Sequence, residues 1–149
     1  MPLTSDSSYL EKRVPHGPEF PHVVAAGVKT FRGSICLVCQ DGTIVLPQTE
    51  NPPSPVVAVV GLADRQLDAT ATAGLAPAVG GEPPLWPKKG CWALPFDTAP
   101  TWADYGKPAY AVDDAQVSLT ETPSGGSARL PVGTIAGFDE AGNAFVLIA

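Results

Sequence analysis

The residue types that most often carry chemistry are few and widely spaced in this sequence. Only two histidines occur, His16 and His22, and both lie in a proline-punctuated segment at the start of the chain. A serine or cysteine nucleophile needs a base held beside it. Because neither histidine belongs to a recognisable strand or helix pattern, we do not expect a Ser-His or Cys-His enzyme.

Three cysteines, Cys36, Cys39 and Cys91, raise the question of a metal or redox site. If Cys36 and Cys39 lie on one strand, their side chains point to opposite faces and cannot share a metal ion. No second cysteine pair completes a zinc-binding set. An odd number of cysteines without a signal peptide is typical of reduced thiols. We therefore expect thiols packed in the core, with no metal and no cofactor.

Two carboxylate pairs, Asp113-Asp114 and Asp139-Glu140, could serve acid–base chemistry or calcium binding. Both fall where turns are predicted, and turn chemistry explains them without a catalytic role. Neither has the ligand spacing of a calcium loop. The glycine pairs Gly80-Gly81 and Gly125-Gly126 lack the strand, lysine and helix of a phosphate-binding loop. The sequence therefore predicts no catalytic residue, and we expect that the protein is not an enzyme.

Charge argues against two classes of partner. The 149 residues carry a net charge of −6 and contain no basic run. Nucleic acids and anionic membranes are both bound through clustered lysine and arginine. The N-terminal residues include no apolar segment of signal-peptide length, and no apolar run is long enough to span a bilayer. We expect a soluble protein that is not exported through a signal sequence.

The best-specified element is a helical turn that leads into a hairpin. Thr101 with Asp104 resembles a capping box, Gly106 suits the left-handed end of a turn, and Pro108 stops the helix. From Lys107 the period changes to two, as in a strand. The hairpin places Tyr110 and Val112 on one face and Ala109 and Ala111 on the other, before the turn at Asp113-Asp114.

The remaining pattern predicts an all-β fold, a small barrel or a sandwich with one short helical turn. An extended N-terminal arm at 1–22 precedes a single β domain at 23–149, which has proline-rich loops at 47–55 and 74–90. The run 56–60 is continuously apolar and predicts a strand buried on both faces. Other strands are predicted at 34–39, 43–46, 91–96, 116–120, 129–136 and 144–148. In 62–73 the residues 63–67 could form a helical turn, but 67–72 alternates better as a strand.

Aromatic and apolar side chains mark candidate contacts. In the arm, Tyr9, Leu10 and Phe20 either belong to a disordered terminus or anchor the arm on a neighbouring subunit. Trp86 lies among prolines in the long loop, where a partner contact and burial are both plausible. We expect Trp92 and Trp102 to pack in the core.

The second half of the chain resembles a known family. Cys91-Trp-Ala-Leu-Pro, followed by TWADYGKPAYAVDD at 101–114, is similar to an "ADxGKxVY-VDD" pattern in small head proteins of tailed bacteriophages. A polar hairpin at 117–120, a strand at 129–137 and a last strand after the acidic-Gly turn follow in the same order. These proteins form the capsid decoration, or cement, family. The resemblance covers 91–149 well and 23–73 weakly, and it excludes the arm and the proline-rich loops.

The resemblance implies a structural virion protein that binds the outside of a phage capsid and stabilises contacts between major capsid subunits. It also implies a minor capsid protein that forms a homo-oligomer, with a trimer favoured, and that is made in the bacterial cytoplasm. Asp104 and Lys107 match the pattern, and we interpret them as structural positions. Two alternatives remain open: a β-barrel module that binds a small ligand or a glycan, and another head or tail subunit.

Overall fold

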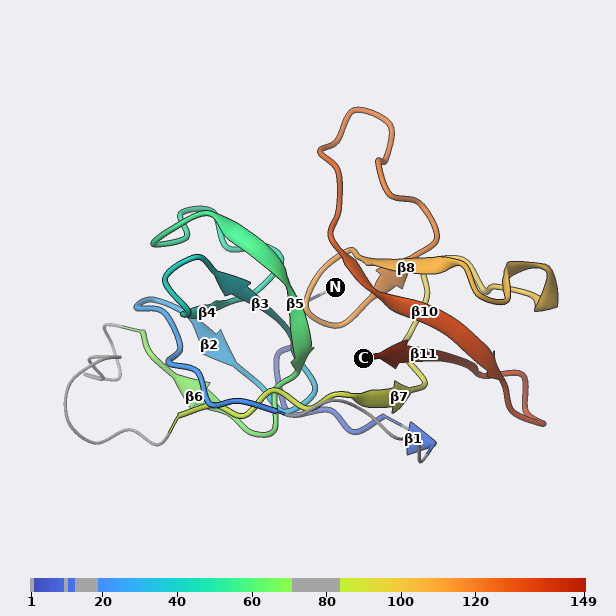
Figure 1. Cartoon of the computed structure of the whole chain (residues 1–149), viewed down its shortest axis with the longest axis horizontal. Helices are drawn as coiled ribbons and strands as arrows, with labels where there is room; N and C mark the ends of the chain where they lie inside the picture. The colour runs from blue at the N-terminus through green and yellow to red at the C-terminus, as the bar shows by residue number, and fades with distance from the viewer. Residues whose placement is uncertain (1, 10, 13–18, 71–83) are drawn as a thin grey trace.

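The computed structural model in Figure 1 describes residues 2–9, 11–12, 19–70 and 84–149 of the chain. Strands dominate this part, and a three-residue 3-10 helix is its one helical element. In chain order the elements are β1 (Glu11–Lys12), β2 (Lys29–Thr30), β3 (Ile35–Cys39), β4 (Ile44–Val45), β5 (Val56–Leu62), β6 (Leu67–Asp68), β7 (Gly90–Trp92), η2 (Trp102–Asp104), β8 (Pro108–Ala111), β9 (Val117–Ser118), β10 (Pro131–Phe138) and β11 (Ala144–Ile148).

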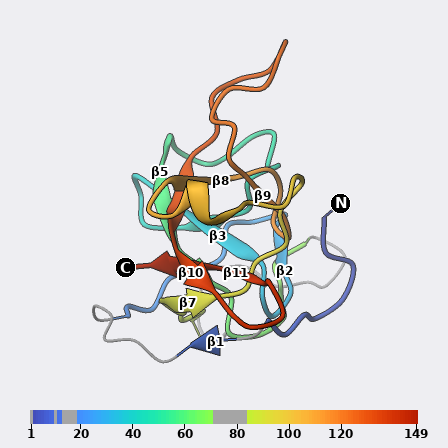
Figure 2. The same ribbon diagram turned by 90° about the vertical axis from the view of Figure 1, so that its right-hand side faces the viewer.

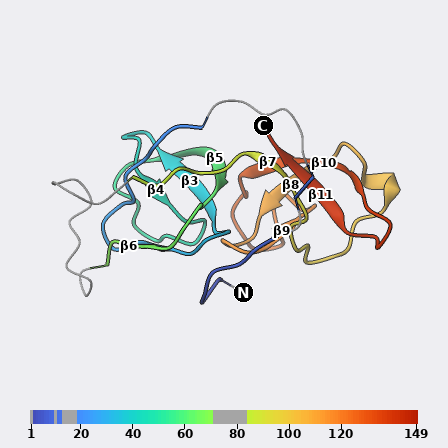
Figure 3. The same cartoon turned by 90° about the horizontal axis from the view of Figure 1, so that it is seen from below.

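The strands form three antiparallel sheets. The largest has the order β1-β7-β11-β10-β8-β9, a second contains β4-β3-β5, and β2 pairs with β6. The six-stranded sheet occupies one half of the molecule and the two smaller sheets the other, as Figures 1 and 3 show. Figure 2 shows a hairpin between β9 and β10 that rises away from the body. No sheet of the described residues closes on itself, so the all-β prediction is confirmed and the sandwich-like form fits.

The predicted tight turns are present and explain the two clearest hairpins. Between β3 and β4, the Asp41 carboxylate accepts hydrogen bonds from the N–H and hydroxyl of Thr43, at 3.0 and 2.6 Å. Gly42 has φ +84°, which a residue with a side chain rarely adopts. Between β10 and β11, Asp139 accepts from the backbone N–H groups of Ala141 and Asn143. Both turns use the aspartate chemistry that the sequence indicates.

Two hydrophobic clusters fill the interior. The first lies among β2 to β6 and includes Ile44, Val45 and Leu85. The second joins β3 and β5 to the six-stranded sheet and includes Ile35, Val117 and Val146. Val59 of β5 packs against both clusters. The halves are therefore packed together along β3 and β5.

The predicted burial of β5 on both faces is wrong. Val57 is 54% exposed, and most of this strand is only half-buried. β5 lies at the edge of its sheet, pairing with β3 alone among the described strands. An apolar run therefore marked an edge strand here, because run length cannot report position in a sheet. Other boundaries also differ from the prediction: β6 ends at Asp68, and β7 ends at Trp92. Residues 71–72 of the predicted strand 67–72 lie outside the described residues.

The described part of the proline-rich segment 74–90 is not the surface loop that the sequence predicts. Residues 71–83 lie outside the described residues, but 84–90 belong to the body of the molecule. Leu85 is fully buried, and it exchanges two backbone hydrogen bonds of 2.8 and 2.9 Å with His22. Nothing local in the sequence predicts this burial, because Pro84 and Pro87 argue against a strand where buried and exposed residues in fact alternate.

Candidate interaction surface

The helical turn has the predicted capping box. The Thr101 hydroxyl accepts from the N–H of Ala103, and the Asp104 carboxylate accepts from the N–H of Thr101 at 2.9 Å. Lys107 donates to the same carboxylate at 2.8 Å. This lysine and the Thr101 N–H hold the pKa of Asp104 below its usual value. Gly106, with φ +78°, ends the turn as predicted.

The turn is also attached to the sheet. The N–H of Gly106 donates to the carbonyl of Ile135 in β10 at 2.9 Å, and the N–H of Ile135 donates to the backbone carbonyl of Lys107 at 2.9 Å. η2 lies at the end of the molecule furthest from the two smaller sheets, on the right of Figure 1. Its backbone is fixed at both of its ends.

The prediction that Trp102 packs in the core is wrong. Its side chain is 66% exposed, and Tyr105 is 60% exposed. The two rings have centroids 6.1 Å apart and planes at 25°, and Phe138 of β10 lies 4.8 Å from Trp102. None of the residues of η2 is buried, and the Trp102 ring and the Tyr105 ring that follows it lie on the surface. We call Trp102, Tyr105 and Phe138 the aromatic tip.

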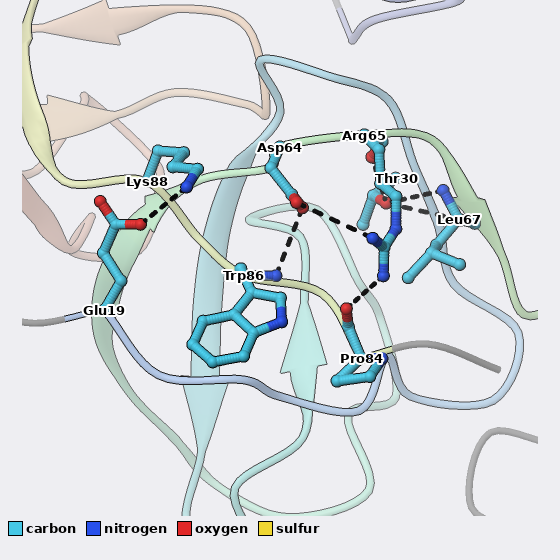
Figure 4. A network of polar contacts seen from close by, with 8 residues as sticks. All are labelled: Glu19, Thr30, Asp64, Arg65, Leu67, Pro84, Trp86 and Lys88. Atoms are coloured by element: carbon cyan, nitrogen blue, oxygen red, sulfur yellow. Dashed lines mark hydrogen bonds and ion pairs between the residues drawn. The ribbon is translucent and has the colours of Figure 1, made fainter. Parts of the chain in front are cut away.

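Two of the candidate contact residues are exposed in the other half. Phe20 is 61% and Trp86 39% exposed, and they lie on the neighbouring segments joined by the His22–Leu85 pairing. Figure 4 shows how the backbone of Trp86 is held: its main-chain N–H donates to the Asp64 carboxylate at 3.3 Å. We use the name Phe20–Trp86 face for the exposed surface of these two paired segments, which carry Phe20 and Trp86.

Ion pairs and backbone contacts reinforce this face. Lys88 bonds to Glu19 at 3.0 Å, which links the two segments directly. Arg65 lies 3.9 Å from the Asp64 carboxylate and donates to the carbonyl of Pro84. Thr30 then ties β2 to the backbone around Arg65. Exposed aromatic residues on such fixed backbone lose little conformational entropy when a partner binds.

The described part of the arm lies on its own chain. β1 pairs with β7, and the N–H of Ser7 donates to the carbonyl of Arg32 at 2.7 Å. The Asp6 carboxylate accepts from the N–H of Arg32. Gly33 leaves room for this contact, because a Cβ there would come within 2.9 Å of the Ser7 carbonyl. Figure 3 shows these first residues beside the junction of the two halves.

Asp114 receives the start of the arm. The residue is 3% exposed, and its carboxylate accepts from the N–H of Leu3 at 2.9 Å and from the hydroxyl of Ser34 at 2.8 Å. Burial raises the pKa of Asp114 above its usual value, although the two donors oppose that shift. Asp113 acts locally, accepting from Ala115 and Gln116 in the predicted turn.

Tyr9 is half-buried, and it packs against the second hydrophobic cluster together with Trp92. The core position predicted for Trp92 is therefore confirmed. A cavity of about 230 Å³ lies beside these rings, lined also by Arg32, Leu62 and Lys88. Leu10 lies outside the described residues, so its predicted role as an anchor stays a prediction.

The thiols are buried in the described structure. Cys36, Cys39 and Cys91 are free and buried, and Cys36 and Cys39 belong to the first hydrophobic cluster. Burial raises the pKa of the Cys36 thiol, which keeps it protonated. No group of three or more potential metal ligands occurs among the described residues.

Comparisons of the chain with family models, with curated proteins and with solved structures gave no match. In the part of the chain that the structure describes, no helix is long and apolar enough to cross a bilayer.

Proposed function

We propose that this protein is a structural component of a phage virion. It binds the outer surface of the capsid and stabilises contacts between major capsid subunits, as a homo-oligomer and without catalysis. The observation that carries the proposal is the pair of exposed, firmly held aromatic surfaces in different halves of the molecule. The resemblance of residues 91–149 to capsid decoration proteins supports the same function.

Bridging neighbouring subunits requires two contact surfaces on one rigid body. The aromatic tip lies in the half with the six-stranded sheet, and the Phe20–Trp86 face lies in the other half. Exposed tryptophan, tyrosine and phenylalanine are the residues most enriched at the centres of protein interfaces. Each contact can be weak, because many copies act together on one shell.

Co-sedimentation with empty mature capsids of its own phage tests this function. We expect saturable binding at a fixed ratio to the major capsid protein. Trp102→Ala and Trp86→Ala should each weaken binding at least about tenfold, as truncation of an interface hot spot does. Val57→Ala is the matched control, since Val57 is exposed but belongs to neither surface. Absence of binding by the full-length protein would refute the proposal.

The aromatic tip also favours a second candidate, a module that binds glycans. Exposed aromatic rings offer flat apolar faces to which a sugar ring can be applied. A glycan array probed with the full-length protein tests this candidate. Specific glycan binding that Trp102→Ala abolishes, together with no capsid binding, would favour it.

A further inference from the structure

The aromatic residues of the tip have several acidic neighbours in the sequence. The two segments that form it, 101–107 and 138–143, contain Asp104, Asp139 and Glu140 but only one cation, Lys107. That lysine is already bound to the Asp104 carboxylate at 2.8 Å. The tip therefore combines exposed rings with an excess of negative charge.

The faces of the aromatic rings also carry a partial negative charge. An aromatic ring has a quadrupole with a negative face, and tryptophan attracts cations most strongly. Trp102 and Tyr105 are both more than half exposed, and their planes differ by only 25°. Phe138 packs against Trp102 from β10 and supports the ring from the sheet.

We propose that the aromatic tip binds the guanidinium or ammonium group of a basic segment of its partner. This inference rests on the proposed function, and it names the partner chemistry at one of the two surfaces. A purely apolar partner would bury the carboxylates near the rings without a counter-charge, which is costly. An arginine or lysine side chain offsets that cost and uses the ring face as well. The net charge of −6 would steer the protein towards such a partner.

The scaffold prepares the tip for this role. The capping box and the Gly106–Ile135 hydrogen bond fix the backbone on both sides of Trp102. Little ordering remains to be done when the partner binds.

Fluorinated tryptophans at position 102 give the first test, in the full-length protein with empty mature capsids. Added fluorine atoms withdraw charge from the ring face while largely preserving its shape. Binding should weaken stepwise along the mono-, di- and trifluoro series, by about tenfold in total. The same series at Trp86 is the control and should show no such trend. Weak binding by Trp102→Ala with no effect of fluorine would overturn this inference and leave the proposed function intact.

Charge gives the second test. Raising the salt concentration from about 50 to 300 mM should weaken capsid binding several-fold, and Glu140→Gln should reduce that salt dependence. A neutral glycan or an apolar partner would show neither effect, and that result would overturn the inference.

A small probe separates this inference from the proposed function. N-acetyl-arginine amide should shift the NMR signal of the Trp102 indole, whereas the uncharged N-acetyl-citrulline amide should not. A shift with arginine alone supports the cation site even if the protein fails to bind capsids. Equal shifts, or none with either probe, would refute it.

Discussion

Two adjacent aspartates, Asp113 and Asp114, make hydrogen bonds of different kinds because their side chains lie in different surroundings. Asp113 caps its own turn, so the sequence alone predicts its role. Asp114, one residue later, is directed into the junction of the halves, where it binds Ser34 and Leu3, 80 and 111 residues away in the chain. Such pairings depend on the tertiary fold, and nothing local in the sequence signals them.

The buried Asp114 should make stability depend on pH. Its pKa is higher in the folded chain than the ordinary value of 3.8, so the folded state binds its proton more tightly. Its contribution to stability is therefore complete below the ordinary value and is lost as pH rises through the folded pKa. We expect the free energy of unfolding, relative to that of Asp114→Asn, to fall as pH rises from about 3 to 7. Urea denaturation across this range measures the difference, and a constant or rising difference would contradict the prediction.

Among the elements, the turn around η2 contributes little to the core and presents exposed aromatic rings. It buries none of its own residues, yet it uses a capping box, a glycine with positive φ and an ion pair to fix its shape. Such an element stabilises the core little, and it fixes the direction in which Trp102 and Tyr105 are presented.

Removing the cap should loosen the turn without unfolding the protein. Thr101→Ala deletes the hydroxyl that accepts from Ala103, at a local cost of about 1 kcal/mol. Thr101→Ser keeps a hydroxyl and is the matched control. We expect faster amide exchange at Ala103 in the alanine variant alone, with the thermal midpoint changed little. Equal exchange in the two variants would show that the cap does not hold the turn.

Local elements were the most predictable part of the fold. Residues close together in the sequence determine the hairpins at Asp41 and Asp139 and the turn at Thr101. The strand predicted at 144–148 has the bounds of β11. Exposure was less predictable: Trp102 was expected in the core and Val57 on a buried strand. Both errors arise because hydrophobicity alone does not tell whether a neighbouring element covers a residue.

At the scale of the whole molecule, the arm acts as a strap across the junction of the halves. Its described residues contact Arg32, Asp114 and β7, which belong to different sheets or to the segments between them. The sequence offered two interpretations of this segment, disorder or ordering on a neighbour. Docking on the same chain was not among them, because strand pairing at the edge of β7 needs only a two-residue match.

Deleting residues 1–9 should lower stability and leave both aromatic surfaces in place. The deletion removes the Leu3 donor from the buried Asp114 carboxylate and takes Tyr9 from the second hydrophobic cluster. A loss of about 2 kcal/mol corresponds to a fall of about 4–8 °C in the thermal midpoint for a chain of this size. Calorimetry measures the midpoint, and Tyr9→Ala should account for part of the fall. An unchanged midpoint would show that the strap carries no stability.

The strand order of the largest sheet has a consequence for synthesis on the ribosome. β11 lies between β7 and β10, so the central position of the sheet is filled by the strand that leaves the ribosome after all the others in it. Until then β7 has no partner on that side, and β10 lacks the backbone groups that close its ladder. The nascent chain must therefore remain incompletely folded, with strand edges open to other chains, until translation has passed residue 148. Rapid production of many copies in one cell would make this interval the one in which aggregation competes with folding.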